Sequence, residues 1–330
     1  MTKEVRERTE PAVIAVTGAS NYLGQGLIKR LLPDPRTRRI VALDIKKPDL
    51  EDPRCVYHRV DLTSPSAHEV VSRLFASEGV GMLVHLVFSY TLSRNRALRH
   101  ELEAIGTMHL LDACSIAGVR RIVARSTTAI YGARPSNPSF IPETQEPYVA
   151  PRGSTVVDKV ELERQLLQHA RLRPDTRVAI LRDCTSLGAT SINYLSSILT
   201  ARHSPRLWGY DPLMQFIHEE DLFRAYHEVV FSGAQGIYNI VGKGVTRYSE
   251  AVRLAGGREL LLPESALRAG AALFWNLGLY DIPPAFIRHL KYAWVADGAK
   301  AARELGFRPE YDCFQALEEA RRTRRGRKTA

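Results

Sequence analysis

The sequence predicts an α/β protein in which a doubly wound parallel sheet carries a smaller C-terminal lobe. Short, continuous apolar runs alternate with longer amphipathic stretches along the first half of the chain, as expected for parallel strands covered by helices on both faces. Right-handed crossovers between such strands wind the sheet outward in both directions. The 330 residues are 45% hydrophobic and 25% charged, which is the composition of a globular protein.

The expected strands are the apolar runs themselves. They are Ala12–Val16, Ile40–Leu43, Val56–Val60, Met82–Val87, Arg121–Arg125 and Val178–Leu181. Apolar residues recur at helical spacing in three longer stretches, which are Tyr22–Leu32, about Leu98–Ala117 and about Thr155–Leu172. This order of strands and helices predicts successive βαβ units.

The regular alternation ends near residue 185, where short helices and loops marked by proline and glycine take over. The last expected helices are Ala299–Leu305 and Phe314–Arg322. We therefore expect an N-terminal extension at 1–10, a sheet domain at 11–185, a second lobe at 186–320 and a tail at 321–330, with parts of 211–245 returning to the sheet domain. In folds of this type a ligand binds outside the carboxyl ends of the strands.

No apolar stretch reaches the ~18 residues that a membrane helix needs. The most apolar segment, Ala266–Leu279, is interrupted by Arg268 and Asn276. Six of the first ten residues are charged, which excludes a secretory signal in this segment. A cytoplasmic protein without a transmembrane segment is expected.

The net charge of +10 is concentrated at the C-terminus. Six positive charges fall within the last ten residues, at Arg321, Arg322, Arg324, Arg325, Arg327 and Lys328. We expect a solvated, disordered tail and no nucleic-acid partner, while an anionic partner such as lipid or RNA is the alternative. The four cysteines are far apart and no histidines pair at helical spacing, so neither a disulfide framework nor a metal site is expected.

The first strand leads directly into the segment TGASNYLG, which spans residues 17–24, and then into a helix. This arrangement presents backbone N–H groups and the positive end of a helix dipole to a pyrophosphate. Asn21 occupies the middle position of the glycine pattern; it tolerates a left-handed backbone, and its side chain is placed to crowd or hydrogen-bond the phosphate. The candidate phosphate-binding residues are Gly18, Ser20, Asn21, Tyr22, Leu23 and Gly24.

Two carboxylates follow at the ends of the next strands. Asp44 lies 20 residues after Gly24, where a carboxylate accepts a hydrogen bond from the ribose 2′-hydroxyl of a dinucleotide. Asp61 and Leu62 end the third strand, within reach of the adenine edge. Asp44 repels a 2′-phosphate, which favours NAD over NADP, although Lys46 and Lys47 just beyond it weaken that preference. The sequence therefore predicts a Rossmann-type NAD site.

Several motifs together resemble the extended short-chain dehydrogenase/reductase family, and within it the UDP-glucose 4-epimerase-like (NAD-dependent epimerase/dehydratase) proteins. The resemblance covers about residues 11–318. Its markers are TGASNYLG at 17–24, VHLVF at 84–88, GTMHLLDAC at 106–114, STTAIYG at 126–132, LRDCTSLG at 181–188, FIHEEDLFRA at 216–225 and GIYNIVGKG at 236–244.

The resemblance implies the roles of several further residues. Thr127 matches the catalytic Ser or Thr, and Lys159 matches the lysine of the Tyr-x-x-x-Lys pair, which binds the nicotinamide ribose and lowers the pKa of the phenol. Leu86, in VHLVF, joins the cofactor-binding residues. The tyrosine itself is missing, because Thr155 stands four residues before Lys159. Glu103 also replaces the asparagine of the family's Asn-x-x-Gly-Thr segment.

An aliphatic hydroxyl is too weak an acid to replace a phenol, so three interpretations remain open. A relocated residue could supply the proton relay, with Tyr148, Glu143, Glu146 and His218 as candidates. The site could bind a ligand without turnover, or the substrate or cofactor could provide the base.

The aromatic residues Tyr131 and Trp208 could stack on a sugar, but we expect both in the core. The resemblance implies an NAD-binding protein that acts on a nucleotide sugar or a related hydroxyl substrate through an altered active site. The alternative is a non-catalytic, NAD-dependent sensor or scaffold. The family resemblance also implies a homodimer formed through the helices expected at 98–117 and 155–172.

Overall fold

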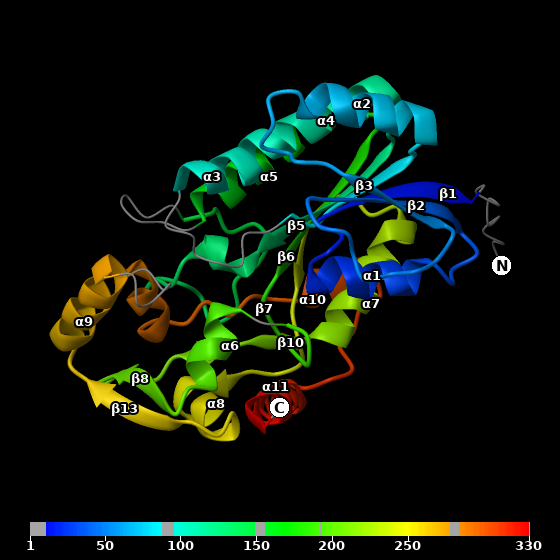
Figure 1. Cartoon of the computed structure of the whole chain (residues 1–330). Helices are drawn as coiled ribbons and strands as arrows, with labels where there is room; N and C mark the ends of the chain where they lie inside the picture. Colours follow the sequence, from blue (N-terminus) through cyan, green and yellow to red (C-terminus); the bar gives the residue numbers. More distant parts are fainter. Residues whose placement is uncertain (1–10, 88–95, 149–155, 192, 278–283, 330) are drawn as a thin grey trace, which may run out of the picture.

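The computed structural model describes residues 11–87, 96–148, 156–191, 193–277 and 284–329. Its centre is a seven-stranded sheet in the order β11-β6-β5-β4-β1-β2-β3 (Figure 1). The strands are β1 (Ala12–Thr17), β2 (Thr37–Asp44), β3 (Cys55–Arg59), β4 (Met82–His85), β5 (Arg121–Thr127), β6 (Arg177–Asp183) and β11 (Gly236–Ile240). Every neighbouring pair is parallel, which confirms the predicted fold class.

Helices cover both faces of this sheet (Figure 1). One face carries α2 (Ala67–Glu78), α4 (Gly106–Ala117) and α5 (Val157–Leu172), and the other carries α1 (Tyr22–Leu31), α7 (Glu219–Ser232) and α10 (Ala299–Glu304). The six expected strands are present with ends shifted by a few residues. Helix α2 and strand β11 are absent from the sequence-based expectations.

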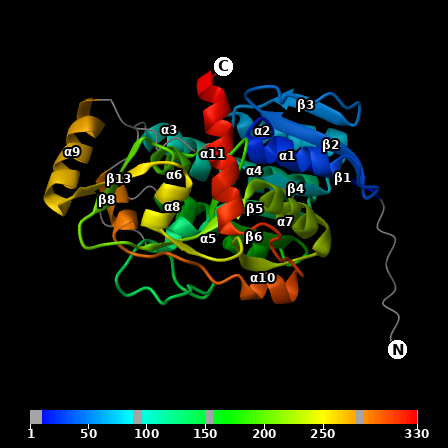
Figure 2. The same cartoon turned by 90° about the horizontal axis from the view of Figure 1, so that it is seen from below.

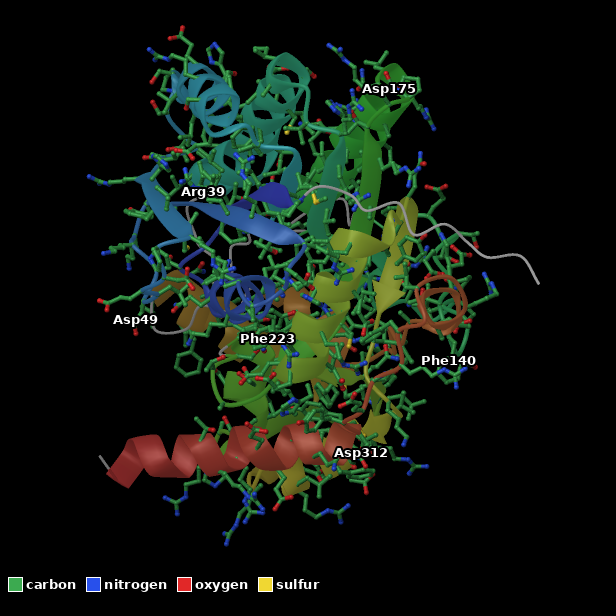
Figure 3. All side chains as sticks on the ribbon, turned by 90° about the vertical axis from the view of Figure 1, so that its right-hand side faces the viewer. Arg39, Asp49, Phe140, Asp175, Phe223 and Asp312 are labelled. Carbon is green, nitrogen blue, oxygen red and sulfur yellow. The ribbon has the colours of Figure 1, made fainter. Side chains whose placement is uncertain are left out.

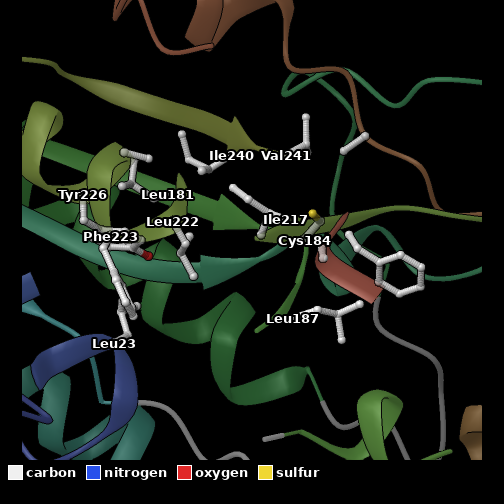
Figure 4. Close-up of a cluster of buried hydrophobic side chains, with 14 of the residues drawn as sticks. Leu23, Leu181, Cys184, Leu187, Ile217, Leu222, Phe223, Tyr226, Ile240 and Val241 are labelled. Atoms are coloured by element: carbon white, nitrogen blue, oxygen red, sulfur yellow. The ribbon is translucent and has the colours of Figure 1, made fainter. Parts of the chain in front are cut away.

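The core lies in two layers because successive residues of a strand point to opposite faces. Along β1, Ile14 and Val16 join one apolar cluster, and Val13 and Ala15 join the other. Figure 4 shows part of the first cluster, where Phe223 of α7 lies near Leu23 of α1. Each fully buried large apolar side chain contributes about 1.5–3 kcal/mol, so both layers hold the carboxyl ends of the strands in place.

The helix expected at 98–117 is interrupted. The structure has α3 (Arg96–His100), a π-helical turn η1 (Glu101–Ile105) and then α4. The Gly106 N–H bonds to the Glu101 carbonyl, five residues earlier, which widens the turn. Such π-turns often occur at functional sites, and this one contains Glu103.

The second lobe is built from short elements. They are β7 (Thr185–Leu187), α6 (Tyr194–Leu199), β8 (His203–Leu207), β9 (Leu213–Met214), β10 (Phe216–His218), β12 (Thr246–Arg247), α8 (Tyr248–Leu254), β13 (Arg258–Leu262), α9 (Glu264–Leu277) and η3 (Pro284–Leu290). Three two-stranded sheets join β10 to β7, β12 to β9 and β13 to β8. Between them the chain returns through α7 and β11 to the main sheet.

The last helix extends into the basic segment that the sequence analysis expects as a disordered tail. Helix α11 (Cys313–Thr329) continues through that segment and lies along the side of the molecule that faces the viewer in Figure 2. Figure 3 shows Asp312 at its beginning. Arginine and lysine have a high helix propensity. The earlier turns of α11 are stabilised by Leu317, which is buried against the rest of the protein, and by the i,i+4 ion pair of Glu318 and Arg322 at 2.7 Å. The helix extends from these turns into the basic segment. Within the described part of the chain, no helix is long and apolar enough to cross a membrane.

Candidate active site

The turn after β1 requires glycine at two positions. Gly18 has a φ of +68°, and a Cβ built there would lie 3.0 Å from the backbone carbonyl of Leu86. A Cβ on Gly24 would lie 2.3 Å from the Gly18 carbonyl oxygen. These close approaches let the backbone turn tightly and bring the N-terminus of α1 to the edge of the sheet, as a pyrophosphate site needs.

Asn21 does not use the left-handed conformation that asparagine tolerates. Its φ and ψ are −74° and 164°, and its side chain caps α1 by accepting a hydrogen bond from the Gly24 N–H at 2.7 Å. The side-chain amide donates to the Leu86 carbonyl at 3.1 Å. Asn21 therefore fixes the turn against the end of β4, and these contacts explain the residue without a phosphate.

The structure brings Asp44 to the turn. Asp44 Oδ2 accepts a hydrogen bond from the Ser20 N–H at 2.9 Å, and its Oδ1 accepts one from the Lys46 N–H at 3.3 Å. A carboxylate at the end of β2, beside the phosphate-binding turn, is positioned as a ribose ligand would be.

Asp61 and Leu62 lie one strand further along the edge. Asp61 is exposed, and hydrogen bonds donated by the hydroxyl and N–H of Thr63 lower the pKa of its carboxyl. Leu62 is buried, and a Cβ on Gly106 would touch its side chain at 3.0 Å. The N–H of Val60, the residue before Asp61, donates to the Asp44 carbonyl at 3.1 Å.

A buried histidine connects the turn with α4. His85, at the end of β4, lies 2.7 Å from Thr17 Oγ1 through Nδ1 and 3.1 Å from Thr107 Oγ1 through Nε2. Thr107 donates its hydroxyl hydrogen to the Glu103 carbonyl at 2.6 Å, so it accepts from Nε2–H, and Nδ1 accepts from Thr17. Burial, with a smaller contribution from Lys159, lowers the pKa of His85 to about 3, so the ring is neutral.

The side chains of Lys159 and Glu103 form a buried pair next to the His85 network. Each residue is 2% exposed, and Lys159 Nζ lies 3.7 Å from Glu103 Oε2. Nζ also donates to the Val87 carbonyl at 3.1 Å. Burial lowers the pKa of the Lys159 amine, and Glu103 opposes part of that effect. The sequence singles out both residues but does not pair them.

Thr127 ends β5 and caps the short 3-10 helix η2 (Thr128–Tyr131). Its Oγ1 accepts a hydrogen bond from the Ala129 N–H at 3.2 Å. The capping role leaves the hydroxyl hydrogen available for donation to a ligand. Thr155, at the position of the missing tyrosine, lies outside the described residues.

The proposed replacements for the tyrosine are held in other contacts. Glu143 Oε1 accepts the Asn239 N–H at 2.9 Å, and Glu146 is exposed. His218 caps α7 by accepting the Glu220 N–H at 3.2 Å, and its Nε2 contacts Glu319 at 2.6 Å. These contacts make His218 a structural residue.

Tyr148 is the remaining candidate in this group. The Arg288 guanidinium lies 3.4 Å from its hydroxyl and 5.7 Å from the centre of its ring, and the Arg134 guanidinium lies 5.0 Å from that centre. The ring packs on Gly132, where a Cβ would lie 2.7 Å away.

The sequence analysis missed a directional hydrogen-bond chain that ties the phosphate turn to the second lobe. Ser191 Oγ donates to the Ser186 carbonyl at 3.0 Å, so the Ser186 hydroxyl donates to Ser191 at 2.7 Å. The Tyr22 phenol therefore donates to Ser186 Oγ at 2.6 Å and accepts from Arg125 at 3.2 Å. The arginine within the apolar run RIVAR is the signal that could have indicated this contact.

A second buried network fixes the carboxyl ends of β5 and β6. Glu163 pairs with Arg182 at 2.6 Å and accepts from the Ser126 hydroxyl at 2.5 Å. Arg182 donates to the Tyr131 hydroxyl at 2.9 Å, and Tyr131 donates to Asn239 at 2.7 Å. Tyr131 is fully buried, which confirms its core placement. In contrast, Trp208 is 75% exposed, so the expectation of a core residue is wrong there.

The fold is that of solved nucleotide-sugar enzymes. UDP-glucose 4-epimerase of Thermotoga maritima, solved with UDP-glucose, superimposes with a TM-score of 0.74 at 18% identity, over 96% of this chain and 99% of that chain. UDP-glucose 4-epimerase of Thermus thermophilus, in complex with NAD, gives 0.73 at 21% identity, over 95% and 99%. These similarities establish the shared architecture.

Sequence comparison extends the relationship. The uncharacterized protein Rv0501 of Mycobacterium tuberculosis is 28% identical over 316 residues, which cover 94% of this chain and 83% of that protein. The model of the NAD dependent epimerase/dehydratase family matches residues 14–241, from β1 through the end of β11. The chain therefore belongs to the NAD dependent epimerase/dehydratase family.

Proposed function

We propose that this protein binds NAD and acts on a nucleotide sugar or a related hydroxyl substrate, through an active site that lacks the family's tyrosine. The observation that carries the proposal is the turn at Gly18. A Cβ there would collide with Asn21 and with the Leu86 backbone, so the turn needs glycine, and the Asp44 carboxylate lies against the same turn at 2.9 Å from the Ser20 N–H. The described residues thus fit a dinucleotide.

The roles follow from where these residues lie. The turn from Gly18 through Gly24 would hold the pyrophosphate with backbone N–H groups. Asp44 would accept from the adenosine ribose, Asp61 and Leu62 would border the adenine, and Lys159 would contact the nicotinamide ribose. When bound, NAD accepts a hydride from a carbon of the substrate. Thr127 would donate a hydrogen bond to the substrate oxygen.

Two glycines offer a matched test of NAD binding. Gly18 and Gly79 have nearly the same φ, +68° and +67°, but a Cβ on Gly79 meets nothing within 4 Å. Both Gly18→Ala and Gly79→Ala strain the backbone, whereas only Gly18→Ala also brings a Cβ into collision with Asn21 and the Leu86 backbone and so distorts the turn. We expect purified wild type and Gly79→Ala to release NAD on denaturation, measured by mass spectrometry, and Gly18→Ala to release none. Wild-type protein that neither carries nor binds NAD would refute the proposal.

Thr155 favours a second candidate, a non-catalytic sensor whose conformation reports NAD occupancy. Such a protein would show NAD-dependent protection from hydrogen exchange in the second lobe but no reduction of bound NAD with any nucleotide sugar. The chain from Tyr22 to Ser191 is the physical connection that would carry this response.

We also propose that two copies pair through α4 and α5. These helices expose the apolar side chains of Ile116 and Leu172, which are 69% and 70% exposed in the single chain. Burying them between copies would remove apolar surface from water. Light scattering should give a dimer for wild type and a monomer for Ile116→Lys. A wild-type monomer at micromolar concentration would contradict the pairing.

A further inference from the structure

Helix α9 forms the outer edge of the second lobe and has an apolar face that no described part of the chain covers. None of its residues is buried. From Ala269 through Leu277 the helix has no charged residue, although helices on a protein surface usually place charges on their exposed face. Leu273, Phe274 and Leu277 share one face of the helix, and each side chain is half exposed or more. Contiguous exposed apolar surface of this kind indicates a binding face.

The strand that leads into α9 continues this apolar surface. Among the described strands β13 pairs with β8 alone, and its residues Leu260 and Leu261 are both exposed. Successive residues of a strand point to opposite faces, so both faces of β13 are open there. Trp208, which follows β8, is 75% exposed, and its N–H donates to the Leu262 carbonyl at 3.0 Å. The tryptophan therefore lies where β13 leads into α9.

Helix α11 brings the basic segment of the chain to the same lobe. Helix α8 packs between α11 and β13, so these elements form a row that ends at α9 (Figures 1 and 2). A Cβ on Gly256, between α8 and β13, would lie 3.1 Å from Arg321 Nε. Beyond Arg321 the helix carries five further positive charges before it ends at Thr329.

The charges beside the apolar surface are also predominantly positive. Two carboxylates are neutralised by cations, because Glu259 lies 2.6 Å from Arg206 and Glu264 lies 2.6 Å from Lys291. Exposed arginines follow the row at Arg202, Arg253 and Arg258. The row therefore combines apolar side chains with a positive charge, which complements an anionic surface.

We propose that the row of α11, α8, β13 and α9 docks on an anionic lipid bilayer. Helix α9 has 14 residues, which is too short to span a bilayer, and it would lie in the plane of the interface with its apolar face toward the acyl chains. Trp208 would sit at the level of the headgroups, which suits an apolar ring with a polar N–H. The basic segment of α11 would lie against the lipid phosphates. The proposal goes beyond the proposed function and does not depend on NAD binding.

The combination of groups favours a bilayer over two other partners. RNA would neutralise the basic segment but would leave Leu273, Phe274 and Leu277 in water. A second copy of the chain would cover these residues but would gain nothing from the basic segment. A bilayer with anionic headgroups meets both kinds of group with one surface.

The first test measures cosedimentation of the purified full chain with lipid vesicles. Vesicles of phosphatidylcholine and phosphatidylglycerol in equal parts should bind it at least about tenfold more tightly than vesicles of phosphatidylcholine alone. Added salt should weaken the binding, because it screens the attraction of the basic segment. Equal affinity for the two kinds of vesicle, or binding to neither, would overturn the proposal.

Two exposed phenylalanines give a matched pair of substitutions. Phe274 is 50% exposed and Phe140, labelled in Figure 3, is 53% exposed, but Phe140 lies outside the row, between η2 and α5. Phe274→Ser should weaken binding to the anionic vesicles about tenfold, and Phe140→Ser should leave it within about twofold. Both variants should melt within about 2 °C of wild type, because neither side chain is buried. Equal losses of binding in the two variants would contradict the docking of α9.

Trp208 reports its own surroundings by fluorescence. Its emission should move to shorter wavelength when anionic vesicles are added, because the ring leaves water for the interface. Trp208→Phe should reduce the shift measured for the whole protein. A shift that Trp208→Phe leaves unchanged would place this residue outside the membrane interface and contradict the proposed orientation.

Removing residues 324–330 separates the charged from the apolar contribution. The truncation removes four positive charges and keeps the whole of α9. It should weaken binding to the anionic vesicles about tenfold and lower its salt dependence, whereas Phe274→Ser should keep the salt dependence of wild type. A truncated chain that binds as tightly as wild type would exclude α11 from the docking surface.

Two further outcomes would assign the surface to another partner. If light scattering shows that Phe274→Ser converts a dimer into a monomer, a second copy covers α9 and the membrane proposal is wrong. If the full chain retards a single-stranded RNA in a gel but does not bind the anionic vesicles, the basic segment serves RNA and the proposal is likewise refuted.

Discussion

Arg125 and Asp183 form a buried, two-point ion pair where β5 and β6 end side by side. Arg125 Nη2 lies 2.6 Å from Asp183 Oδ2, and Nε lies 3.1 Å from Oδ1. Both residues are 3% exposed. The same guanidinium donates to the phenol of Tyr22 in the phosphate turn, so the pair connects the sheet edge with the cofactor-binding segment.

Removing one partner of this pair should destabilise the fold. Asp183→Asn leaves the Arg125 charge buried and replaces one of the two oxygens that accept from Arg125 and Tyr226 with an amide donor. We expect a loss of about 3–5 kcal/mol in the free energy of unfolding, measured by urea denaturation. Asp49→Asn, at the exposed position labelled in Figure 3, should change it by less than about 0.5 kcal/mol. Similar stabilities for the two variants would show that the pair contributes little.

Asp44 should determine the choice between the two dinucleotides. Its carboxylate lies beside the Ser20 N–H and repels a 2′-phosphate, while Lys46 and Lys47 follow it in the chain. Asp44→Asn removes the repulsion and keeps the size of the side chain. Calorimetric titration should then show the ratio of NADP to NAD affinity rising about tenfold, which corresponds to about 1.4 kcal/mol. An unchanged ratio would place the 2′-position away from Asp44.

His85 should make stability depend on pH below neutrality. Burial lowers its pKa from 6.5 to about 3, so between these values the unfolded chain binds a proton that the folded protein does not. The stabilisation is fully present above pH 6.5 and is lost as the pH falls toward 3, by up to about 1.4 kcal/mol per pH unit.

His85→Gln removes this titrating group. Urea denaturation at several pH values between 5 and 7 should therefore give a shallower decline for the variant than for wild type, by up to about 1.4 kcal/mol per unit. His289 is half-buried, and desolvation lowers its pKa to about 3, so part of the decline should persist in the variant. Parallel curves for the two proteins would exclude His85 as a source.

The end of α11 should be dispensable for stability, although it is helical. The helix residues that pack on the body include Ala316, Leu317 and Ala320, all before the basic segment. Removing residues 324–330 should leave the melting temperature within about 2 °C of wild type. Leu317→Ala, which removes a fully buried side chain, should cost about 2–5 kcal/mol. A large loss on truncation would show that the terminal turns carry packing of their own.

The sequence by itself was sufficient to predict the parallel sheet and the glycine turn, and it singled out Asp44, which the structure places beside that turn. Continuous apolar runs and the positions of glycines are local features, and they imply their structure without knowledge of distant residues. Helix α2 was not predicted from the sequence, because no distinctive motif marks its amphipathic pattern. The conformation of Asn21 was not predicted, because its side-chain amide donates to the Leu86 carbonyl, 65 residues away.

Only the tertiary structure decided which charged residues meet. The three buried ion pairs of Arg125 with Asp183, Glu163 with Arg182 and Lys159 with Glu103 join elements that are distant along the chain. A single sequence shows each as a lone charge within an apolar pattern. The free energy that fixes such a pair comes from its burial and its partner, and both exist only once the strands and helices have packed.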